Sequence, residues 1–254
     1  MSGHVVTEIA GDVLTLRFNR PDKKNAILSA MYADAATALK AAETDNNVRV
    51  VVITGSGDSF SAGNDLKDFM ENPPADHNAP VFRFMFGLSS FPKPVIAAVN
   101  GIAVGIGTTV LLHCDFAYAV PTAKFQLPFV NLALVPEFAS SLLLARHLGT
   151  RKATELLMLA ETFDAETALS FGLINAVVPA DQLEATVQAK AKALAAKPPA
   201  ALRATKALLK ADGNEVSARI SLEAKIFSER LQSGELREAI TAFFEKRAPD
   251  FSKF

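Results

Sequence analysis

The chain has 254 residues, of which half are apolar, so it is long enough to bury a sizeable core. Its formal net charge is −1 and it has no basic cluster, which excludes nucleic-acid binding driven by counterion release. The single cysteine, Cys114, excludes an internal disulfide framework, and no signal-peptide pattern or apolar run of membrane-spanning length is present, so we expect a cytoplasmic protein that does not enter a membrane.

The first half of the chain has the pattern of strands separated by helices. Alternating apolar and polar residues predict two strands that meet at Gly11, and Ser29 is the expected cap of the helix that follows. The uniformly apolar run 48–53 predicts a strand that is buried on both faces. The predicted strands are 4–10, 12–19, 48–53, 94–99, 115–120, 124–126 and 173–178.

The second half is mostly helical. A capping box from Asp181 to Glu184 predicts one helix start, and Pro198-Pro199 opens the next helix where proline is tolerated. We therefore divide this α/β chain into a strand-and-helix body, residues 1–195, and a helical extension, residues 196–254. The main helices are predicted at 139–148, 152–160, 165–171, 181–197, 215–232 and 235–247.

The stretch 59–69 connects the buried strand 48–53 to a short amphipathic segment. A strand followed by a glycine-containing turn and a helix start leaves backbone N–H groups unpaired and pointing outward. Gly63 permits torsions, or an approach to a ligand, that a Cβ would obstruct. The alternative is an ordinary turn with Asp65 as the helix N-cap, and this stretch alone does not separate the two interpretations.

A second glycine-rich helix start, 101–107, follows the predicted strand 94–99. Its spacing is not that of a dinucleotide-binding turn, and it lacks the lysine of a phosphate loop. What remains is a helix N-terminus with free N–H groups near Ile106. The turns around Asn64 and Ile106 could converge on one oxygen, because paired backbone donors stabilise an enolate or oxyanion. The alternative is that both turns serve packing only.

Glu137 stands alone in the otherwise apolar stretch 129–138. A carboxylate in such surroundings has a raised pKa, which suits it to moving a proton. The alternative is a helix-start glutamate that faces solvent beside Pro136. No Ser-His-Asp arrangement is visible, the histidines lack distinctive partners, and no spacing fits a metal site, so we expect no metal.

Three motifs resemble the enoyl-CoA hydratase/isomerase, or crotonase, superfamily: FSAGNDLKDF (60–69), VNGIAVGIGTTVLLHCDFAYAV (99–120) and LPFVNLALVPEFASSLLLARHLG (127–149). NRPDKKNA (19–26), GLINAVVP (172–179) and the terminal FFEKRAPDF also fit, so the resemblance spans essentially the whole chain. It implies a crotonase-like spiral of β-β-α units, followed by a helical region that assembles trimers, often paired into hexamers. It also implies an acyl-CoA substrate, with coenzyme A as part of the substrate and no separate cofactor.

The resemblance also implies positions for the site. The thioester oxygen would lie between the backbone N–H groups of Asn64 and Ile106. Phe129 and some of the phenylalanines in 82–86 would contact the acyl chain. The residues implied to line the coenzyme A path are Lys24, Ala26, Ala62, Gly63, Asn64, Asp65 and Leu66, with Asp65 also capping the turn.

The catalytic carboxylates distinguish members of the superfamily. Hydratases use two glutamates to position and split water, and the corresponding positions here are Thr109 and Phe129, which cannot act as carboxylates. Glu137 instead resembles the single base of peroxisomal-type Δ3,Δ2-enoyl-CoA isomerases, although that branch more often has a glycine and a small residue where this chain has Phe138-Ala139. We therefore expect an isomerase of fatty-acid β-oxidation. The alternatives are a hydratase or another crotonase-type reaction, and a non-catalytic acyl-CoA-binding protein.

Overall fold

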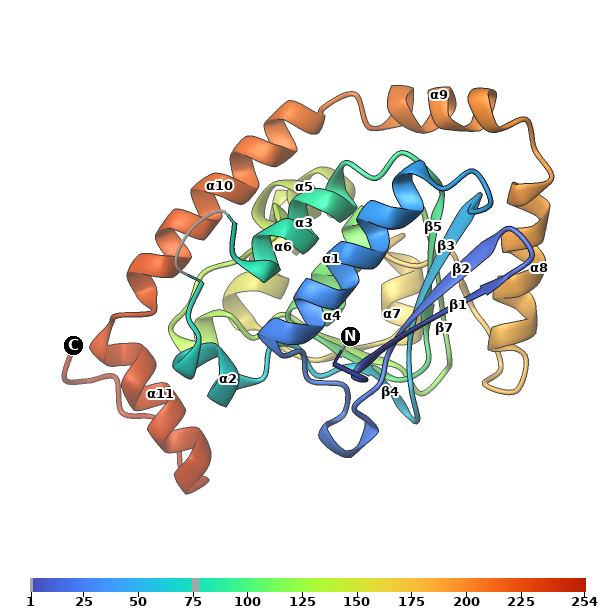
Figure 1. The fold of residues 1–254 in the computed structure, drawn as a ribbon. Helices are drawn as coiled ribbons and strands as arrows, with labels where there is room; N and C mark the ends of the chain where they lie inside the picture. Colours follow the sequence, from blue (N-terminus) through green and yellow to red (C-terminus); the bar gives the residue numbers. More distant parts are fainter. Residues whose placement is uncertain (1, 75–77) are drawn as a thin grey trace.

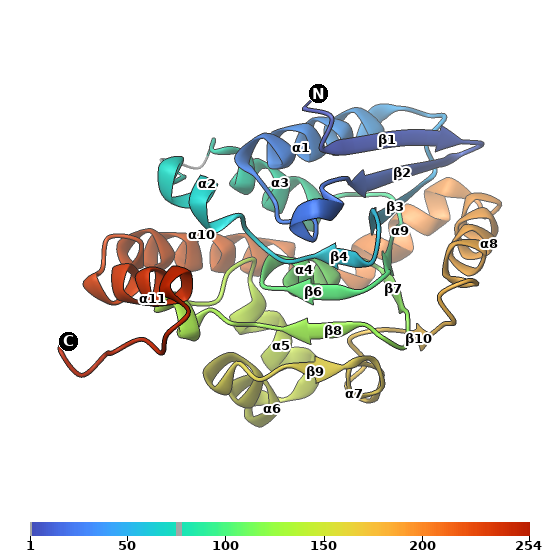
Figure 2. The ribbon, with the colours of Figure 1, turned by 90° about the horizontal axis from the view of Figure 1, so that it is seen from below.

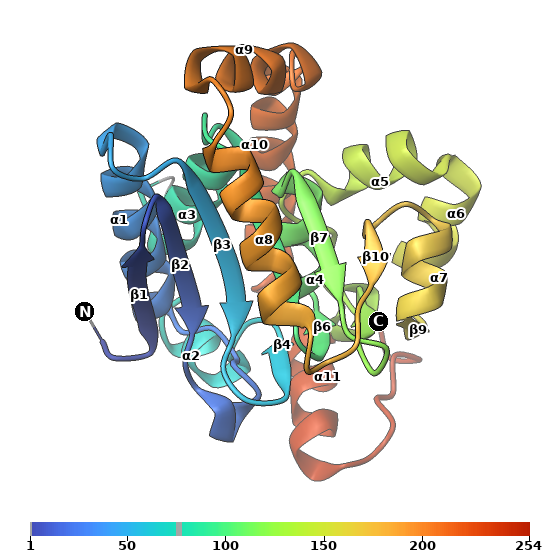
Figure 3. The ribbon, with the colours of Figure 1, turned by 90° about the vertical axis from the view of Figure 1, so that its right-hand side faces the viewer.

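The structure, a computed structural model, describes residues 2–74 and 78–254. Within these residues, the larger of two sheets consists of strands that lie side by side in Figures 1 and 3. Its first two strands are antiparallel and all later neighbours are parallel. In spatial order the strands are β1 (Val5–Ala10), β2 (Val13–Phe18), β3 (Val50–Gly55), β5 (Val95–Val99), β7 (Phe116–Ala119) and β10 (Ala176–Val177).

A second, smaller sheet lies beside the first (Figure 2). Its strands, in order, are β4 (Ser59–Ser61), β6 (Ile102–Val104), β8 (Lys124–Gln126) and β9 (Phe163–Asp164). Strands β3, β5 and β7 of the first sheet lead directly into β4, β6 and β8 of the second, and each pair is followed by helical residues. Because both sheets keep the same order, the chain advances as a spiral of strand–strand–helix units, which confirms the predicted fold class.

Helices cover both faces of the larger sheet. The helices α1 (Ser29–Thr44) and α3 (Pro80–Ser89) pack against each other on one face, and α8 (Leu183–Ala195) crosses the other (Figure 3). All six residues of β3 are buried, as its uniformly apolar sequence predicts. The remaining helices are α2 (Leu66–Glu71), α4 (Ile106–Thr109), α5 (Ser140–Leu148), α6 (Thr150–Thr154), α7 (Ala165–Ser170), α9 (Pro199–Leu209), α10 (Gly213–Arg230) and α11 (Gly234–Glu245).

The helical extension runs around the edge of this body as α9, α10 and α11 (Figure 1). Of these, α10 packs against α3 and α5, so it reaches the region that the 127–149 motif forms. Its buried face includes Val216, Ile220, Glu223, Ala224 and Phe227. A carboxylate among these apolar residues needs hydrogen-bond partners, because burial of an unpaired charge is costly.

The predicted cap of α1 is wrong. Ser29 is the first residue of the helix, and the N-cap position is Leu28, whose side chain cannot accept a hydrogen bond. The carboxylate of Asp68 in α2 accepts the backbone N–H of Ser29 at 2.6 Å instead. The cap therefore comes from another helix, which a local sequence pattern does not reveal.

Two further local predictions differ from the structure, and two short strands have no counterpart among the predictions. The capping box at 181–184 does not form, since α8 begins at Leu183 and its N-cap Gln182 makes no side-chain cap. The predicted helix 152–160 is divided into α6 and a turn of π-helix, Glu155–Leu159. Strands β4 and β6 were not predicted, because segments of three residues are too short to show a period of two.

Candidate active site

The two glycine turns lie against each other. Strand β4 pairs in parallel with β6, which places the residues after each strand at the same end of the smaller sheet. A Cβ on Gly63 would lie 2.9 Å from the carbonyl oxygen of Val104, and one on Gly107 would lie 2.7 Å from the carbonyl oxygen of Ser61. Both distances are shorter than side-chain contacts allow, so only glycine permits the turns to approach this closely.

The approach leaves two backbone donors available. In the parallel bridge between Ile27 and Asn64, Ile27 bonds Gly63 and Asp65, so the N–H of Asn64 faces away from this pairing. Ile106 is the first residue of α4, where an N–H has no partner within the helix. Among the described residues, no acceptor is found for either N–H. The two donors therefore remain free to bind a developing oxyanion.

The side chain of Asn64 is held by Tyr32. The Tyr32 hydroxyl donates to Oδ1 of Asn64 at 2.5 Å, from a buried position on α1. Burial and the nearby charge of Glu137 raise the pKa of Tyr32, so the phenol keeps its proton. The hydrogen bond fixes the residue that carries one of the two backbone donors.

Glu137 is buried, with 6% of its surface exposed, which removes the solvent-facing alternative. Its Oε1 accepts a hydrogen bond from the Thr109 hydroxyl at 2.6 Å, while Oε2 has no partner among the described residues. Burial raises the pKa of Glu137 to about 8; the Thr109 hydrogen bond opposes this rise and the charge of Glu223 adds to it. The carboxyl group can therefore exchange a proton near neutral pH.

The backbone after Glu137 is left-handed at two residues that have side chains. Phe138 has φ +57° and Ala139 has φ +56°, a region that favours glycine. Phe138 stacks on the ring of His113 with centroids 3.7 Å apart, and its carbonyl oxygen lies 2.7 Å from His113 Nε2. Burial lowers the pKa of His113 to about 3, so the ring is neutral and Nε2 carries the hydrogen that this bond requires.

Glu137 and Asn64 line the same pocket. Apart from these two, its walls are mainly apolar and come from α2, α3 and α10: Phe69, Val81, Phe82, Met85, Ile220 and Phe227. The rings of Phe69 and Phe227 meet edge to face with centroids 5.8 Å apart, which links α2 to α10 across the pocket. An acidic side chain in an apolar pocket that is also lined by Asn64, whose N–H is free, is an arrangement suited to proton transfer next to a polarised carbonyl, although Ile106 is not among the residues that line this pocket.

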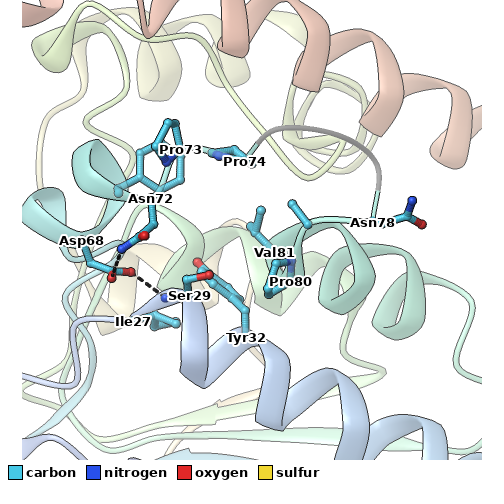
Figure 4. Close-up of a pocket in the computed structure, with 12 residues that line it drawn as sticks. Ile27, Ser29, Tyr32, Asp68, Asn72, Pro73, Pro74, Asn78, Pro80 and Val81 are labelled. Atoms are coloured by element: carbon cyan, nitrogen blue, oxygen red, sulfur yellow. Dashed lines mark hydrogen bonds between the residues drawn. The ribbon is translucent and has the colours of Figure 1, made fainter.

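A second pocket, about 350 Å³ in volume, adjoins the first between α1, α2 and α3 (Figure 4). The two pockets share Phe69, Pro74 and Val81 as lining residues. Figure 4 shows Asp68 at its edge, bonded to Ser29 and to the side-chain amide of Asn72. Together the pockets offer an extended space on one side of Glu137. Among the phenylalanines predicted to contact the acyl chain, Phe82 lines the first pocket.

The structure also brings together the residues implied for the coenzyme A path. The N–H of Ala62 donates to the carbonyl of Lys24 at 2.9 Å, so the early turn lies beside the first glycine turn. Lys24 is exposed and pairs with Asp58 at 2.7 Å. Asp65 caps α2 through the N–H of Asp68 and pairs with Arg20 at 3.1 Å, as its predicted capping role requires.

Phe129 lies elsewhere. It is buried and is not among the residues that line either pocket.

Sequence reasoning missed two groups that touch the catalytic region, the hydroxyl of Thr109 and the carboxylate of Glu223. In the sequence Thr109 indicates only the absence of a glutamate, whereas Glu223 lies 84 residues from its partner Ala139 and has no sequence signal. Within the described residues, no cluster of His, Cys, Asp or Glu is suited to hold a metal ion, and no helix is long and apolar enough to cross a bilayer.

The profile of the enoyl-CoA hydratase/isomerase family matches residues 8–253, and the chain belongs to this family. It is 38% identical to human enoyl-CoA delta isomerase 2 over 96% of this chain, and it spans 64% of that relative's length. It is 36% identical to 1,2-epoxyphenylacetyl-CoA isomerase of Escherichia coli, over 99% of both chains. A probable enoyl-CoA hydratase of Bacillus subtilis is 38% identical over 89% of this chain and 90% of its own.

Solved structures agree with the fold. The structure of Pseudomonas aeruginosa OdaA is 48% identical and superposes with a TM-score of 0.92, covering 95% of this chain and 99% of its own. The chain is thus a crotonase-fold enzyme of the hydratase/isomerase family. Because the relatives carry names of both isomerases and hydratases, the comparisons leave the reaction to be argued from the site.

Proposed function

We propose that the protein is a Δ3,Δ2-enoyl-CoA isomerase. The observation that carries this proposal is the buried carboxyl of Glu137, whose Oε2 has no partner among the described residues, in the pocket that Asn64 also lines. Hydration needs groups that position and split a water molecule, and the two positions implied for them hold Thr109 and Phe129. Moving a double bond adds nothing to the substrate, so one acid–base group is sufficient.

In the proposed reaction, the carboxylate of Glu137 removes a proton from C2 of a 3-enoyl-CoA. The electron pair moves into the thioester, and the N–H groups of Asn64 and Ile106 stabilise the negative oxygen of the dienolate. Glu137, now protonated, returns the proton to C4 and the double bond becomes 2,3. No atom is gained or lost, and the carboxylate is regenerated.

The environment of Glu137 suits both halves of this cycle. A pKa near 8 makes the carboxylate a stronger base than an exposed glutamate, while the acid form still releases its proton readily. The Thr109 hydrogen bond fixes one oxygen, which leaves the other to move between C2 and C4. The adjoining pocket gives the acyl chain a path away from the reacting carbons.

The proposal extends to the coenzyme A path, the oligomeric assembly and the cellular location of the enzyme. Coenzyme A would be part of the substrate and would pass along the early turn at Lys24 and Ala26, with no separate cofactor. The extension would assemble a homotrimer or a pair of trimers, for which exposed apolar side chains on α9 and α11, such as Leu208, Leu209 and Phe243, are suitable contacts. Light scattering of the purified protein tests the assembly. We place the enzyme in cytoplasmic fatty-acid β-oxidation.

The deciding experiment incubates the protein with 3-enoyl-CoA and, separately, 2-enoyl-CoA, and follows the products by chromatography and mass spectrometry. Conversion of 3-enoyl-CoA to 2-enoyl-CoA, lost in Glu137→Gln, would support the proposal. A gain of one water by 2-enoyl-CoA without isomerisation would replace it with a hydratase. Binding of both compounds with no turnover would indicate another acyl-CoA substrate, such as 1,2-epoxyphenylacetyl-CoA, or a non-catalytic role.

A further inference from the structure

The turn after Glu137 needs support from outside its own sequence. Two consecutive residues with a Cβ, Phe138 and Ala139, adopt left-handed torsions that such residues disfavour. A strained backbone persists only where its surroundings hold it. Since this turn fixes the direction of the Glu137 side chain, whatever holds the turn also fixes the acid–base group.

The carboxylate of Glu223 binds this turn from α10. Its Oε2 accepts the N–H of Ala139 at 2.6 Å, and its Oε1 accepts the N–H of Ser141 at 3.0 Å and also the Ser141 hydroxyl. Glu223 is 5% exposed, and both oxygens are satisfied by donors, as a buried carboxylate requires. These donors are the otherwise unpaired groups at the start of α5.

Helix α10 contacts the Glu137 loop at a second place. Arg230, two turns after Glu223, donates from Nε to the carbonyl oxygen of Ala133 at 3.0 Å. Arg219, one turn before Glu223, donates to the Ser141 hydroxyl at 3.1 Å. The same helix supplies Ile220 and Phe227 to the wall of the Glu137 pocket. One helix of the extension therefore holds the loop on both sides of Glu137 and closes the pocket over it.

We propose that Glu223 is a positioning residue, which holds the left-handed Phe138-Ala139 turn so that Oε2 of Glu137 reaches the substrate. The reaction affected is the one stated under Proposed function, so its kinetic consequence rests on that proposal, whereas the effect on the Glu137 side chain does not. Glu223 touches no reacting atom; it acts through Ala139 and Ser141.

Charge supports the same role. The carboxylate of Glu223 adds to the rise in the pKa of Glu137, so its neutralisation lowers that pKa. The other titratable groups around the turn are Arg219 on α10, Tyr32 on α1 and, stacked on Phe138, the neutral ring of His113. Of these, Arg219 lies beside Glu223 and loses its charge partner when Glu223 is neutralised.

The test compares Glu223→Gln with Ala139→Gly and with the double variant. Glutamine keeps the shape but offers one acceptor oxygen, so the turn loses at least one bond. Glycine at 139 accepts the left-handed torsions without strain and should make the turn less dependent on Glu223. Asp164→Asn is the matched control: Asp164 also caps a helix start through a carboxylate, at the edge of the smaller sheet, away from Glu137.

Two readouts are measured on the full-length protein: the kcat and KM for 3-enoyl-CoA, and the pKa of Glu137 from ¹³C NMR of labelled glutamate, with the signal assigned by its loss in Glu137→Gln. We expect Glu223→Gln to lower kcat by about 10- to 100-fold, since misplacement of a reacting group by about 1 Å can cost about 10²-fold. KM should change little, the pKa of Glu137 should fall, and the added Ala139→Gly should restore part of kcat. Asp164→Asn should change neither readout.

An unchanged titration of Glu137 in Glu223→Gln, or a kcat within about twofold of wild type, overturns the proposal. Failure of glycine at 139 to restore any activity also overturns it, because Glu223 would then act on something other than the turn. If Glu223→Gln alone does not fold, Ala139→Gly is compared with the double variant in the same way. If the wild type itself does not isomerise 3-enoyl-CoA, the proposed function fails, and the NMR titration still decides whether Glu223 acts on Glu137, since an unchanged titration overturns that influence.

Discussion

The two halves of the candidate site are built in different ways. The two glycine turns have Gly63 and Gly107 at points where their backbones approach closely, so their geometry is specified within a few residues. The turn that carries Glu137 has no glycine at its left-handed positions, Phe138 and Ala139. It depends instead on a carboxylate from α10 and on the ring of His113.

The difference predicts which kind of substitution disrupts each half of the site. A glycine turn fails when a Cβ is introduced, because the clash is local and the neighbouring atoms are backbone. The Glu137 turn fails when a distant partner is removed, because the chain around it does not prefer the conformation it adopts. Substitutions in the two halves should therefore have distinct signatures, and the following predictions run from the largest effect to the smallest.

Glu137→Gln should lower kcat/KM for 3-enoyl-CoA by about 10²–10⁴-fold, because it removes the only acid–base group among the described residues that line the pocket. The same change should stabilise the fold. With its pKa raised to about 8, Glu137 is largely protonated in the folded protein at pH 7 but ionised in the unfolded chain. This group therefore lowers the free energy of unfolding as the pH rises from the pKa of an unfolded glutamate toward 8. Urea unfolding at pH 7 should show a gain on the order of 3 kcal/mol. A variant that is inactive and also less stable would contradict the assignment.

Gly107→Ala should separate the two oxyanion turns. The added Cβ would meet the Ser61 carbonyl at 2.7 Å, and misalignment of one donor costs about 10²–10³ in kcat. The matched control is Gly87→Ala in α3, where a Cβ meets nothing within 4 Å and a helix gains about 1 kcal/mol from alanine. Steady-state kinetics and thermal unfolding of both variants make the comparison. Equal kinetics in the two would remove the oxyanion role from this turn.

Thr109→Val should raise the pKa of Glu137, because the lost hydrogen bond is the contact that opposes the effect of burial. The base form then appears at higher pH, so the rising limb of the kcat/KM profile should move upward, with a loss of about 10-fold at pH 7. Glu223→Gln should move the same limb downward. Thr109→Ser keeps the hydroxyl and should restore the wild-type profile. A downward shift in the valine variant would show that the hydrogen bond does not act in this way.

His113→Phe should cost about 1–3 kcal/mol at pH 7, since the ring stack can persist but the buried carbonyl of Phe138 loses its donor. In the wild type, His113 stays neutral when folded but gains a proton when unfolded. The free energy of unfolding therefore falls as the pH falls from about 6.5 toward 3. The variant lacks this loss. Urea unfolding at pH 7 and 4.5 should therefore show a smaller difference between the two proteins at the lower pH.

Much of the fold could be predicted from the sequence, because its signals are local. The buried strand at 48–53, the strand–strand–helix order and the cap at Asp65 follow from apolar patterning and turn chemistry. The caps of α1 and α8 could not be predicted in this way, since Asp68 supplies the first from α2 and the second makes no side-chain cap. Short strands such as β4 left no periodic signal.

The sequence by itself marked the two glycine turns, because a glycine after a strand indicates a backbone conformation that other residues disfavour, but it left open whether the turns bind an oxyanion or serve packing only. It also singled out Glu137, but it left open whether that carboxyl faces water or the interior. Only the tertiary structure decided this. The Thr109 hydroxyl bonds Glu137, and the Glu223 carboxylate bonds Ala139 in the turn that follows it, and both come from segments far from Glu137 in the chain. The pKa and direction of an acid–base group depend on such non-local contacts, which no local pattern of residues encodes.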